Sequence, residues 1–243
     1  MDTPTNVEEV KKHSFHIVLL LLLATIVGSL VVGLFVERNT MVRVLDDAGY
    51  EALSTMTHPA WLTMLVAPFN YNFLPLGPAF IPSFLLIFVA TFLAWMRWKH
   101  RALFPWALLT IALGFLYGNL LFSITSNVIF RARPFTTLPN TLDQFAKSVW
   151  ISWSSFPSGH TRDTTMYGTI IASYLPNVRW WVAAFAVFIA FSRVYVGAHY
   201  PTDVVAGLLV GYLAGKVAVL LTREIQLLFS NRRVRAHGDK PKA

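Results

Sequence analysis

The sequence predicts an all-α protein that crosses a membrane six times, and its composition and its pattern of apolar runs both indicate this. Of its 243 residues, 55% are hydrophobic and only 13% are charged, whereas an ordinary soluble domain carries about 25% charged residues. The hydrophobic residues are gathered into runs that approach the roughly 20 residues a helix needs to cross a bilayer. A polytopic membrane protein is therefore expected.

Six apolar runs are expected to span the membrane. They are residues 15–36, 78–98, 103–125, 164–175, 180–196 and 202–221. The fourth is short and rich in Thr, and it is kept because the topology fails without it. A cleaved signal peptide is the alternative for the first run, but no small-residue cleavage site follows it. We expect a membrane domain over 15–225, with a cytoplasmic segment before it at 1–14 and a basic cytoplasmic tail at 226–243.

The basic residues predict the orientation. With a cytoplasmic amino terminus, most of the 20 Lys and Arg side chains lie on the cytoplasmic side, as the positive-inside rule requires. Both termini are then cytoplasmic in an inner membrane. The segments 37–77 and 131–162 and the turn around His199 face outward. Within the first of these, residues 60–66 suit a short helix on the outer leaflet, either as a portal for a lipid tail or as a cap on the bundle.

Small residues and the absence of cysteine give two further constraints. Gly207, Gly211 and Gly215 recur at a spacing of four in the last span, a pattern typical of closely packed helices in lipid. With no cysteine in the chain, disulfides, thiolate metal sites and a cysteine nucleophile are excluded. The net charge is +8, and the basic residues lie between apolar runs, so membrane lipids rather than nucleic acid are the expected partners. No pattern in the sequence predicts an oligomeric state.

Three polar clusters interrupt the apolar runs on the outward face. Ionisable residues at the ends of membrane spans are costly and usually functional. The clusters are residues 131–134 (Arg-Ala-Arg-Pro), 157–161 (Pro-Ser-Gly-His-Thr) and 192–203, which runs from Ser192 and Arg193 to His199 and Asp203. They are far apart in sequence, but the expected topology brings all three to one side of the membrane.

These residue types suit the chemistry of a phosphate ester. Arginine presents a planar fork of donors that matches phosphate oxygens, and Ser158 and Gly159 precede a helix, whose free N–H groups attract anions. Pro201 suits the first position of a helix, so Asp203 can fold back onto His199. That contact would select one tautomer of the imidazole and leave its other nitrogen as a nucleophile.

The ordered motifs resemble those of the type 2 phosphatidic acid phosphatase superfamily. The resemblance rests on Arg133-Pro134, on the Pro-Ser-Gly-His run at 157–160, and on Ser192-Arg193 followed by His199 and Asp203. It covers close to 100 residues, from about the third span to the sixth. It implies a membrane-embedded phosphatase with its catalytic site open to the outer face.

The resemblance also implies a role for each motif residue. His199 attacks phosphorus to form a phosphohistidine, and Asp203 orients it. His160 is the acid for the leaving oxygen and then the base that activates water. The phosphoryl oxygens are held by Arg133, Ser158, Gly159 and Arg193. Neither a metal nor any other cofactor is implied.

One family position differs in this chain. The family has a lysine seven residues before the motif arginine, where this sequence has Ser126. Its hydroxyl would share a helix face with Arg133 if the helix continued that far. Arg131 and Arg162 are the other auxiliary candidates, since either could supply the missing charge.

The leading substrate is undecaprenyl pyrophosphate, because bacteria must dephosphorylate that carrier outside the cell. Phosphatidylglycerophosphate, phosphatidic acid and a lipid A phosphate are the alternatives within the same class. A lipid phosphotransferase would share the phosphohistidine. A transporter of anions or lipids would place charges near the bilayer centre, where this sequence has almost none. A haem protein or a vanadium haloperoxidase fits the motifs and the six spans less well.

Overall fold

The computed structural model describes residues 5–54, 56, 58–70, 83–134 and 154–238, and these residues form helices joined by short connections. The order along the chain is α1 (Thr5–Arg38), α2 (Thr40–Ser54), α3 (Ala60–Asn70), α4 (Ser83–Lys99), α5 (Phe104–Val128), α8 (Gly159–Tyr174), a 3₁₀ turn (Pro176–Val178), α9 (Arg179–Tyr195) and α10 (Pro201–Gly238). Within the described ranges no strand occurs, as the all-α prediction requires.

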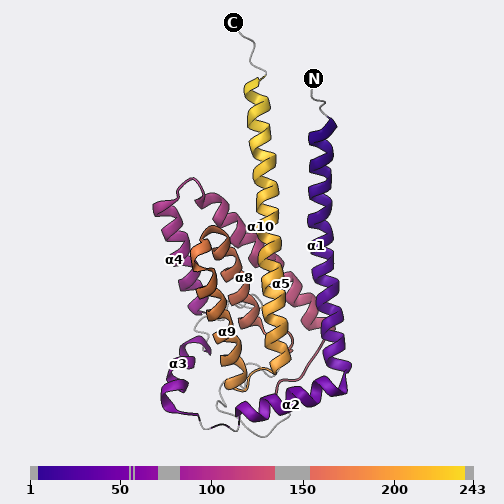
Figure 1. The fold of residues 1–243 in the computed structure, drawn as a ribbon, viewed down its shortest axis with the longest axis vertical. Helices are drawn as coiled ribbons and strands as arrows, with labels where there is room; N and C mark the ends of the chain where they lie inside the picture. Colours follow the sequence, from indigo (N-terminus) through magenta and orange to yellow (C-terminus); the bar gives the residue numbers. More distant parts are fainter. Residues whose placement is uncertain (1–4, 55, 57, 71–82, 135–153, 239–243) are drawn as a thin grey trace.

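The long helices run side by side, and α10 lies at the centre of their contacts (Figure 1). It packs most extensively on α8 and also touches α5, α1 and α9. Both ends of the chain emerge at one end of the bundle, whereas α2 and α3 cover the opposite end (Figure 1). The beginnings of α8 and α10 and the end of α9 therefore meet near α2.

Among the described residues, four helices are long and apolar enough to cross a bilayer, compared with the six spans expected. They are Val18–Arg38, Phe104–Val128, Pro176–Tyr195 and Pro201–Ser230, which match the first, third, fifth and sixth expected spans. The described part of α4 has 17 residues, and residues 78–82 of its expected span lie outside the described residues. Helix α8 has 16 residues, and its polar composition is tolerated because α5, α9 and α10 enclose it.

The loop segment between the first two expected spans contains two helices. Helix α3 includes the short helix expected at 60–66, while α2 was not expected. Helix α2 is amphipathic: Asp46 and Tyr50 are buried, whereas Val44 and Leu45 are exposed. Residues 71–77, the end of the outward segment, lie outside the described residues, as does most of 131–162, including Lys147.

The glycines spaced by four in α10 allow its close approach to α8, as expected. A Cβ atom added at Gly207, Gly211 or Gly215 would lie 2.9, 2.2 or 2.8 Å from a backbone carbonyl oxygen of Ser158, Arg162 or Met166. Beside this contact, buried side chains from α5, α8 and α10 form the main core, including Leu121, Met166, Ile170, Val210 and Val217.

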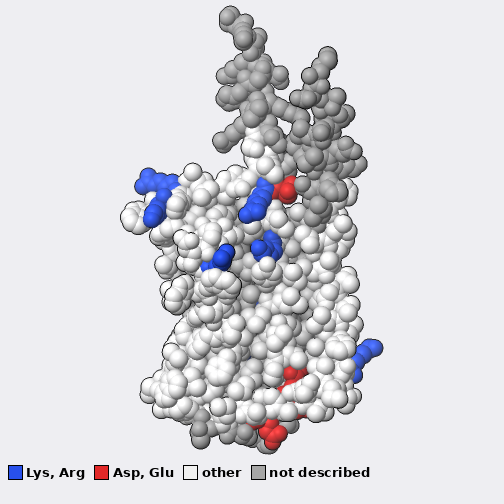
Figure 2. Space-filling view, viewed as in Figure 1, with Lys and Arg blue, Asp and Glu red and all other residues white. Residues whose placement is uncertain are grey.

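Charged side chains avoid the middle of the bundle surface. On the face drawn in Figure 2, most Lys and Arg lie toward the end where the termini emerge, with one acidic patch beside them, and the other acidic residues lie toward the α2 end. A broad band with few charges separates the two ends. Arg97 and Lys99 lie in the last turn of α4. A band with few charges between two charged ends is the surface expected of a protein surrounded by lipid.

Candidate active site

Backbone hydrogen bonds tie the three sequence clusters together at the α2 end of the bundle. The N–H of Ser155 donates to the carbonyl of Arg131 at 2.8 Å, and the N–H of Ser158 donates to the carbonyl of Asp203 at 3.0 Å. The N–H of His199 donates to the carbonyl of Arg193 at 3.2 Å. The motifs that sequence order alone suggested are therefore neighbours in space.

The start of α10 places both His199 and Asp203. Pro201 is the first residue of the helix, where its missing N–H costs nothing. Asp203 turns back, and its Oδ2 accepts the N–H of Tyr200 at 2.9 Å, an arrangement that resembles the reciprocal cap of a helix amino terminus. Just before it, Gly197 adopts φ +74°, which a residue with a side chain rarely adopts, and this turn brings His199 back toward α9.

The contacts of His199 assign its tautomer. Nδ1 lies 2.9 Å from the carbonyl oxygen of Ser155, which can only accept, so Nδ1 carries the hydrogen and Nε2 keeps its lone pair. Burial, together with the charge of Arg133, lowers the pKa of His199 from 6.5 to about 3. The imidazole is thus neutral near pH 7, the form that a nucleophile requires.

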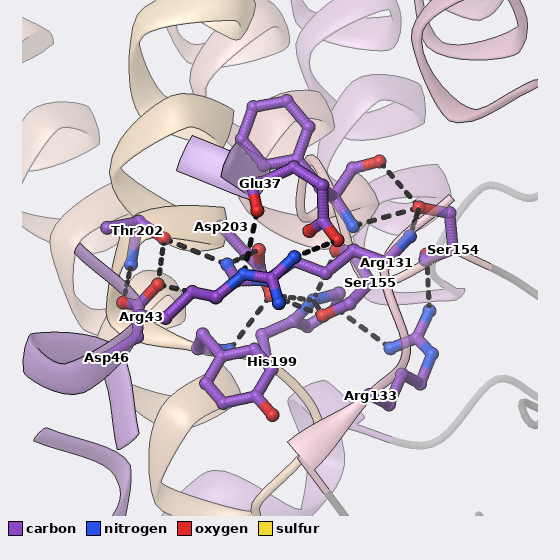
Figure 3. Close-up of polar contacts among 12 residues, drawn as sticks. Glu37, Arg43, Asp46, Arg131, Arg133, Ser154, Ser155, His199, Thr202 and Asp203 are labelled. Carbon is purple, nitrogen blue, oxygen red and sulfur yellow. Dashed lines mark hydrogen bonds and ion pairs between the residues drawn. The ribbon is translucent and has the colours of Figure 1, made fainter. Parts of the chain in front are cut away.

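Arg133 lies against the nucleophilic side of this imidazole (Figure 3). Its Nη1 is 3.2 Å from Nε2 of His199 and donates to the carbonyl of Ala198 at 2.9 Å. Burial lowers the pKa of Arg133 to about 10, so the guanidinium stays charged at neutral pH. A positive fork beside the nucleophilic nitrogen is suited to the oxygens of a phosphoryl group.

Asp203 contacts more partners than the sequence predicted. Its Oδ2 is 3.7 Å from Nδ1 of His199, farther than the carbonyl of Ser155, and it accepts a short hydrogen bond from the Ser155 hydroxyl. Its Oδ1 accepts Nη1 of Arg131 at 2.7 Å. The carboxylate therefore supports His199 electrostatically, while Ser155 supplies the hydrogen-bond acceptor that orients the ring.

The first turn of α8 contributes the second motif. Ser158 is the N-cap residue and is fully buried. Among the described residues, a Cβ atom added at Gly159 would touch only Phe122, at 3.9 Å, so the space beside this glycine at the start of the helix is open. His160 is 3% exposed and lies within electrostatic range of His199, Arg133 and Arg193. Arg193, in the last turn of α9, is equally buried.

Of the three auxiliary candidates, Arg131 contacts this group through Asp203, whereas Ser126 and Arg162 bind other partners. Helix α5 ends at Val128 with an extended residue after it, so the condition for placing Ser126 on the same helix face as Arg133 is not met. Ser126 instead donates to the carbonyl of Ser123 at 3.4 Å. Its hydroxyl is used locally on α5.

Both auxiliary arginines are paired with carboxylates. Arg162 binds Asp163, with its Nη2 2.5 Å from Oδ1, and its guanidinium lies over the ring of Phe122. Arg131 is held by Asp203 and Asp46. Neither guanidinium is thus arranged as a simple substitute for the family lysine.

Sequence reasoning missed Ser154, Ser155 and Asp46. The serine pair lies just before the second motif, and this position is the one signal that could have identified it. Ser154 accepts the backbone N–H of Arg131 at 3.2 Å, which secures the first motif to the second. For Asp46, the sequence offers no comparable signal, because it lies far from every motif.

The assembled group can perform nucleophilic substitution at phosphorus. It offers a neutral histidine with a defined tautomer, a second buried histidine, two buried arginines and the amino terminus of a helix. Among the side chains that the structure describes, no group of three or more His, Asp or Glu is placed to hold a metal ion.

Comparison with known proteins agrees with this geometry. Residues 105–226 match the PAP2 superfamily. A lipid A 1-phosphatase of Rhizobium johnstonii is 32% identical over 135 residues, which are 55% of this chain and 55% of the relative. An undecaprenyl-diphosphatase of Sulfolobus acidocaldarius is 31% identical over 104 residues, 42% of this chain and 49% of the relative. The chain thus spans about half the length of each.

A solved structure shares the fold. The PAP2 type phosphatidylglycerolphosphate phosphatase from Bacillus subtilis superposes with a TM-score of 0.62 at 22% identity, covering 84% of this chain and 96% of that one. The matched family region contains α8, α9 and the start of α10, whose ends build the site. With the family match extending over half of its residues, the chain belongs to the PAP2 superfamily.

Proposed function

We propose that the protein is an integral-membrane phosphatase that removes phosphate from a lipid phosphate or diphosphate through a phosphohistidine intermediate. The observation that carries the proposal is the geometry of His199, whose Nδ1 donates to Ser155 while Nε2 faces Arg133 at 3.2 Å. The family and its phosphatase relatives support a hydrolase.

In the first step, Nε2 of His199 attacks phosphorus and the bond from phosphorus to the leaving oxygen breaks. His160, which takes up a proton when the anionic headgroup binds beside it, gives this proton to that oxygen, which departs with the lipid. Asp203 stabilises the positive charge that develops on the ring of His199. Arg133, Arg193 and the N–H groups at Ser158 and Gly159 hold the phosphoryl oxygens as their charge grows.

In the second step, His160 takes a proton from water, and the water oxygen attacks the phosphohistidine. The bond from phosphorus to Nε2 breaks, which frees inorganic phosphate and restores neutral His199. No metal takes part in either step. An acceptor alcohol in place of water would make the same intermediate a phosphotransferase.

The proposed substrate is undecaprenyl pyrophosphate, with phosphatidylglycerophosphate, phosphatidic acid and lipid A phosphate as the alternatives. Its tail stays in the bilayer while the headgroup reaches the α2 end of the bundle. Two relatives, an undecaprenyl-diphosphatase and a lipid A 1-phosphatase, support this class of substrate.

We further propose six spans, with α4 and α8 as the second and fourth, and a site on the outer face of the inner membrane. The basic end seen in Figure 2 supports cytoplasmic termini. Because the chain has no cysteine, a single one can be introduced without background. A membrane-impermeant maleimide should label Asp47→Cys in intact cells, and Lys99→Cys only after lysis. The reverse pattern would refute the orientation.

The activity is tested by phosphate release in detergent with excess EDTA, comparing undecaprenyl pyrophosphate, phosphatidylglycerophosphate and phosphatidic acid. We expect release that survives EDTA and is lost in His199→Ala. His100→Ala is the matched control, since His100 follows α4 at the other end of the bundle. Equal activity of His199→Ala and His100→Ala would refute the mechanism, and no release from any lipid would refute the function.

A further inference from the structure

A buried carboxylate from α2 lies behind the group described above. Asp46 is 1% exposed, and its Oδ2 is 2.6 Å from Nη2 of Arg131. Its Oδ1 accepts the backbone N–H of Thr202 at 2.9 Å, and Oδ2 also accepts a short hydrogen bond from the Thr202 hydroxyl. Both oxygens of Asp46 thus bind Arg131 or Thr202, which lie next to Asp203 (Figure 3).

These contacts form one chain from α2 to His199. Asp46 binds one nitrogen of Arg131, and the other nitrogen of Arg131 binds Oδ1 of Asp203 at 2.7 Å. The remaining oxygen of Asp203 faces the Ser155 hydroxyl and His199. Since Arg131 also lies 4.1 Å above the ring of Tyr200, its position is determined on three sides.

The rest of α2 is seated on the same loop. A Cβ atom at Gly49 would lie 2.9 Å from Cγ of Pro201, and one at Gly197 would lie 3.1 Å from the hydroxyl of Tyr50. This close approach excludes solvent from the pair of Asp46 and Arg131. The pair is therefore a strong electrostatic contact rather than a screened surface ion pair.

We propose that Asp46 is a positioning residue for the reaction, which shares the guanidinium of Arg131 with Asp203 and thereby sets the orientation and effective charge of the catalytic carboxylate. The inference rests on the proposed function. It adds a part of the machinery that lies outside the matched family region, which begins at residue 105.

The reason is a balance of buried charge. One guanidinium between two carboxylates leaves a net negative charge behind His199, which favours the positive ring that forms on attack at phosphorus. Without the charge of Asp46, Arg131 is balanced by Asp203 alone. The support that Asp203 gives to the developing imidazolium is then weaker, and Arg131 is freer to draw Asp203 away from Ser155.

The test compares Asp46→Asn with Asp47→Asn, its exposed neighbour on the same helix. Asparagine keeps the shape of Asp46 and an oxygen for the N–H of Thr202, but its NH2 group cannot accept from Arg131, so it removes both the charge and the link to Arg131. We expect kcat on the best lipid substrate to fall about tenfold or more, with KM within about twofold, since Asp46 does not face the phosphoryl group. Asp47→Asn should match the unaltered protein in both constants.

A double-mutant cycle separates positioning from general stability. In an Arg131→Met background, adding Asp46→Asn should change kcat by less than about threefold, because the link to Asp203 is already broken. If Asp46→Asn does not fold, Thr202→Val tests the same chain of contacts without changing a charge, and kcat should again fall at constant KM.

Three outcomes would overturn the inference. One is an Asp46→Asn variant with the kcat of Asp47→Asn, which would leave the proposed function intact. The second is a fall in kcat by the same factor in both backgrounds, which would make Asp46 a structural anchor only. The third is absence of phosphate release by the unaltered protein, which would remove the proposed function together with the inference.

Discussion

Gly211→Ala should separate α10 from α8 and weaken both folding and catalysis. The added Cβ would lie 2.2 Å from the carbonyl oxygen of Arg162, where ordinary contact begins at 3.4 Å, and 2.9 Å from Cβ of Thr165. The backbone oxygen cannot rotate away, so the helices must move apart by about 1 Å, and overpacking of this kind costs about 1–3 kcal/mol. For a chain of this length that is a fall of about 3–10 °C in the midpoint of thermal unfolding.

The same shift displaces the residues proposed to be catalytic. Helix α8 carries His160 and α10 carries Asp203, and a misplacement of about 1 Å can lower a rate about a hundredfold. Gly28→Ala is the control, because a Cβ atom there meets nothing within 4 Å. Both substitutions gain the same helix propensity from alanine, so the difference between them reports the packing alone.

The assay is the thermal midpoint in detergent, followed by gel filtration, together with phosphate release well below that midpoint. We expect Gly28→Ala to match or slightly exceed the unaltered protein in stability. If Gly211→Ala does the same and keeps full activity, the close approach of the two helices is not needed, and the reasoning is refuted.

Three further variants test the site and its surroundings. Ser155→Ala should lower kcat about tenfold or more, because Asp203 loses a charge-assisted hydrogen bond; unchanged kcat would contradict this. His199 takes up a proton near pH 6.5 in the unfolded chain but only near pH 3 in the folded protein. The free energy of unfolding should therefore decrease as the pH is lowered through this window, and it should decrease less steeply in His199→Gln. Equal slopes of the thermal midpoint against pH in the two proteins would contradict this reasoning. Trp61 is an exposed residue of α3. If it lines a portal for the lipid tail, Trp61→Ala should lower kcat/KM about fivefold on long-chain lipids and leave kcat/KM on a short soluble ester unchanged. An equal loss on both substrates would indicate a cap on the bundle instead.

The parts of the site that the sequence could predict are those determined by local chemistry. Pro201 marks the first residue of α10, so His199 and Asp203 could be placed at a helix start before the structure was known. The Pro-Ser-Gly-His run at 157–160 likewise begins α8. These features depend on a few neighbouring residues, and the structure places the three motifs together at one end of the bundle.

The parts that could not be predicted depend on long-range contacts. Helix α2 is too short and too polar to read as a membrane span, and its buried face holds Asp46 against Thr202, 156 residues later. Counting apolar residues also misjudges α8, which is enclosed by other helices and can therefore carry Arg162 and Asp163. Hydropathy reports contact with lipid, and neither feature is defined by that contact.

The missing lysine is best understood through the same long-range pairs. Arg162 is neutralised by Asp163 and also donates to the carbonyl of Gly118 at 3.1 Å, so its charge serves the packing of α8 against α5. Arg131 is committed to two carboxylates. In the proposed mechanism, Arg133 and Arg193 therefore balance the phosphoryl charge, and the contribution of Arg131 reaches the substrate through Asp203 and His199. An arginine next to a motif can thus affect the rate without touching the phosphate, a role that its place in the sequence does not distinguish from binding.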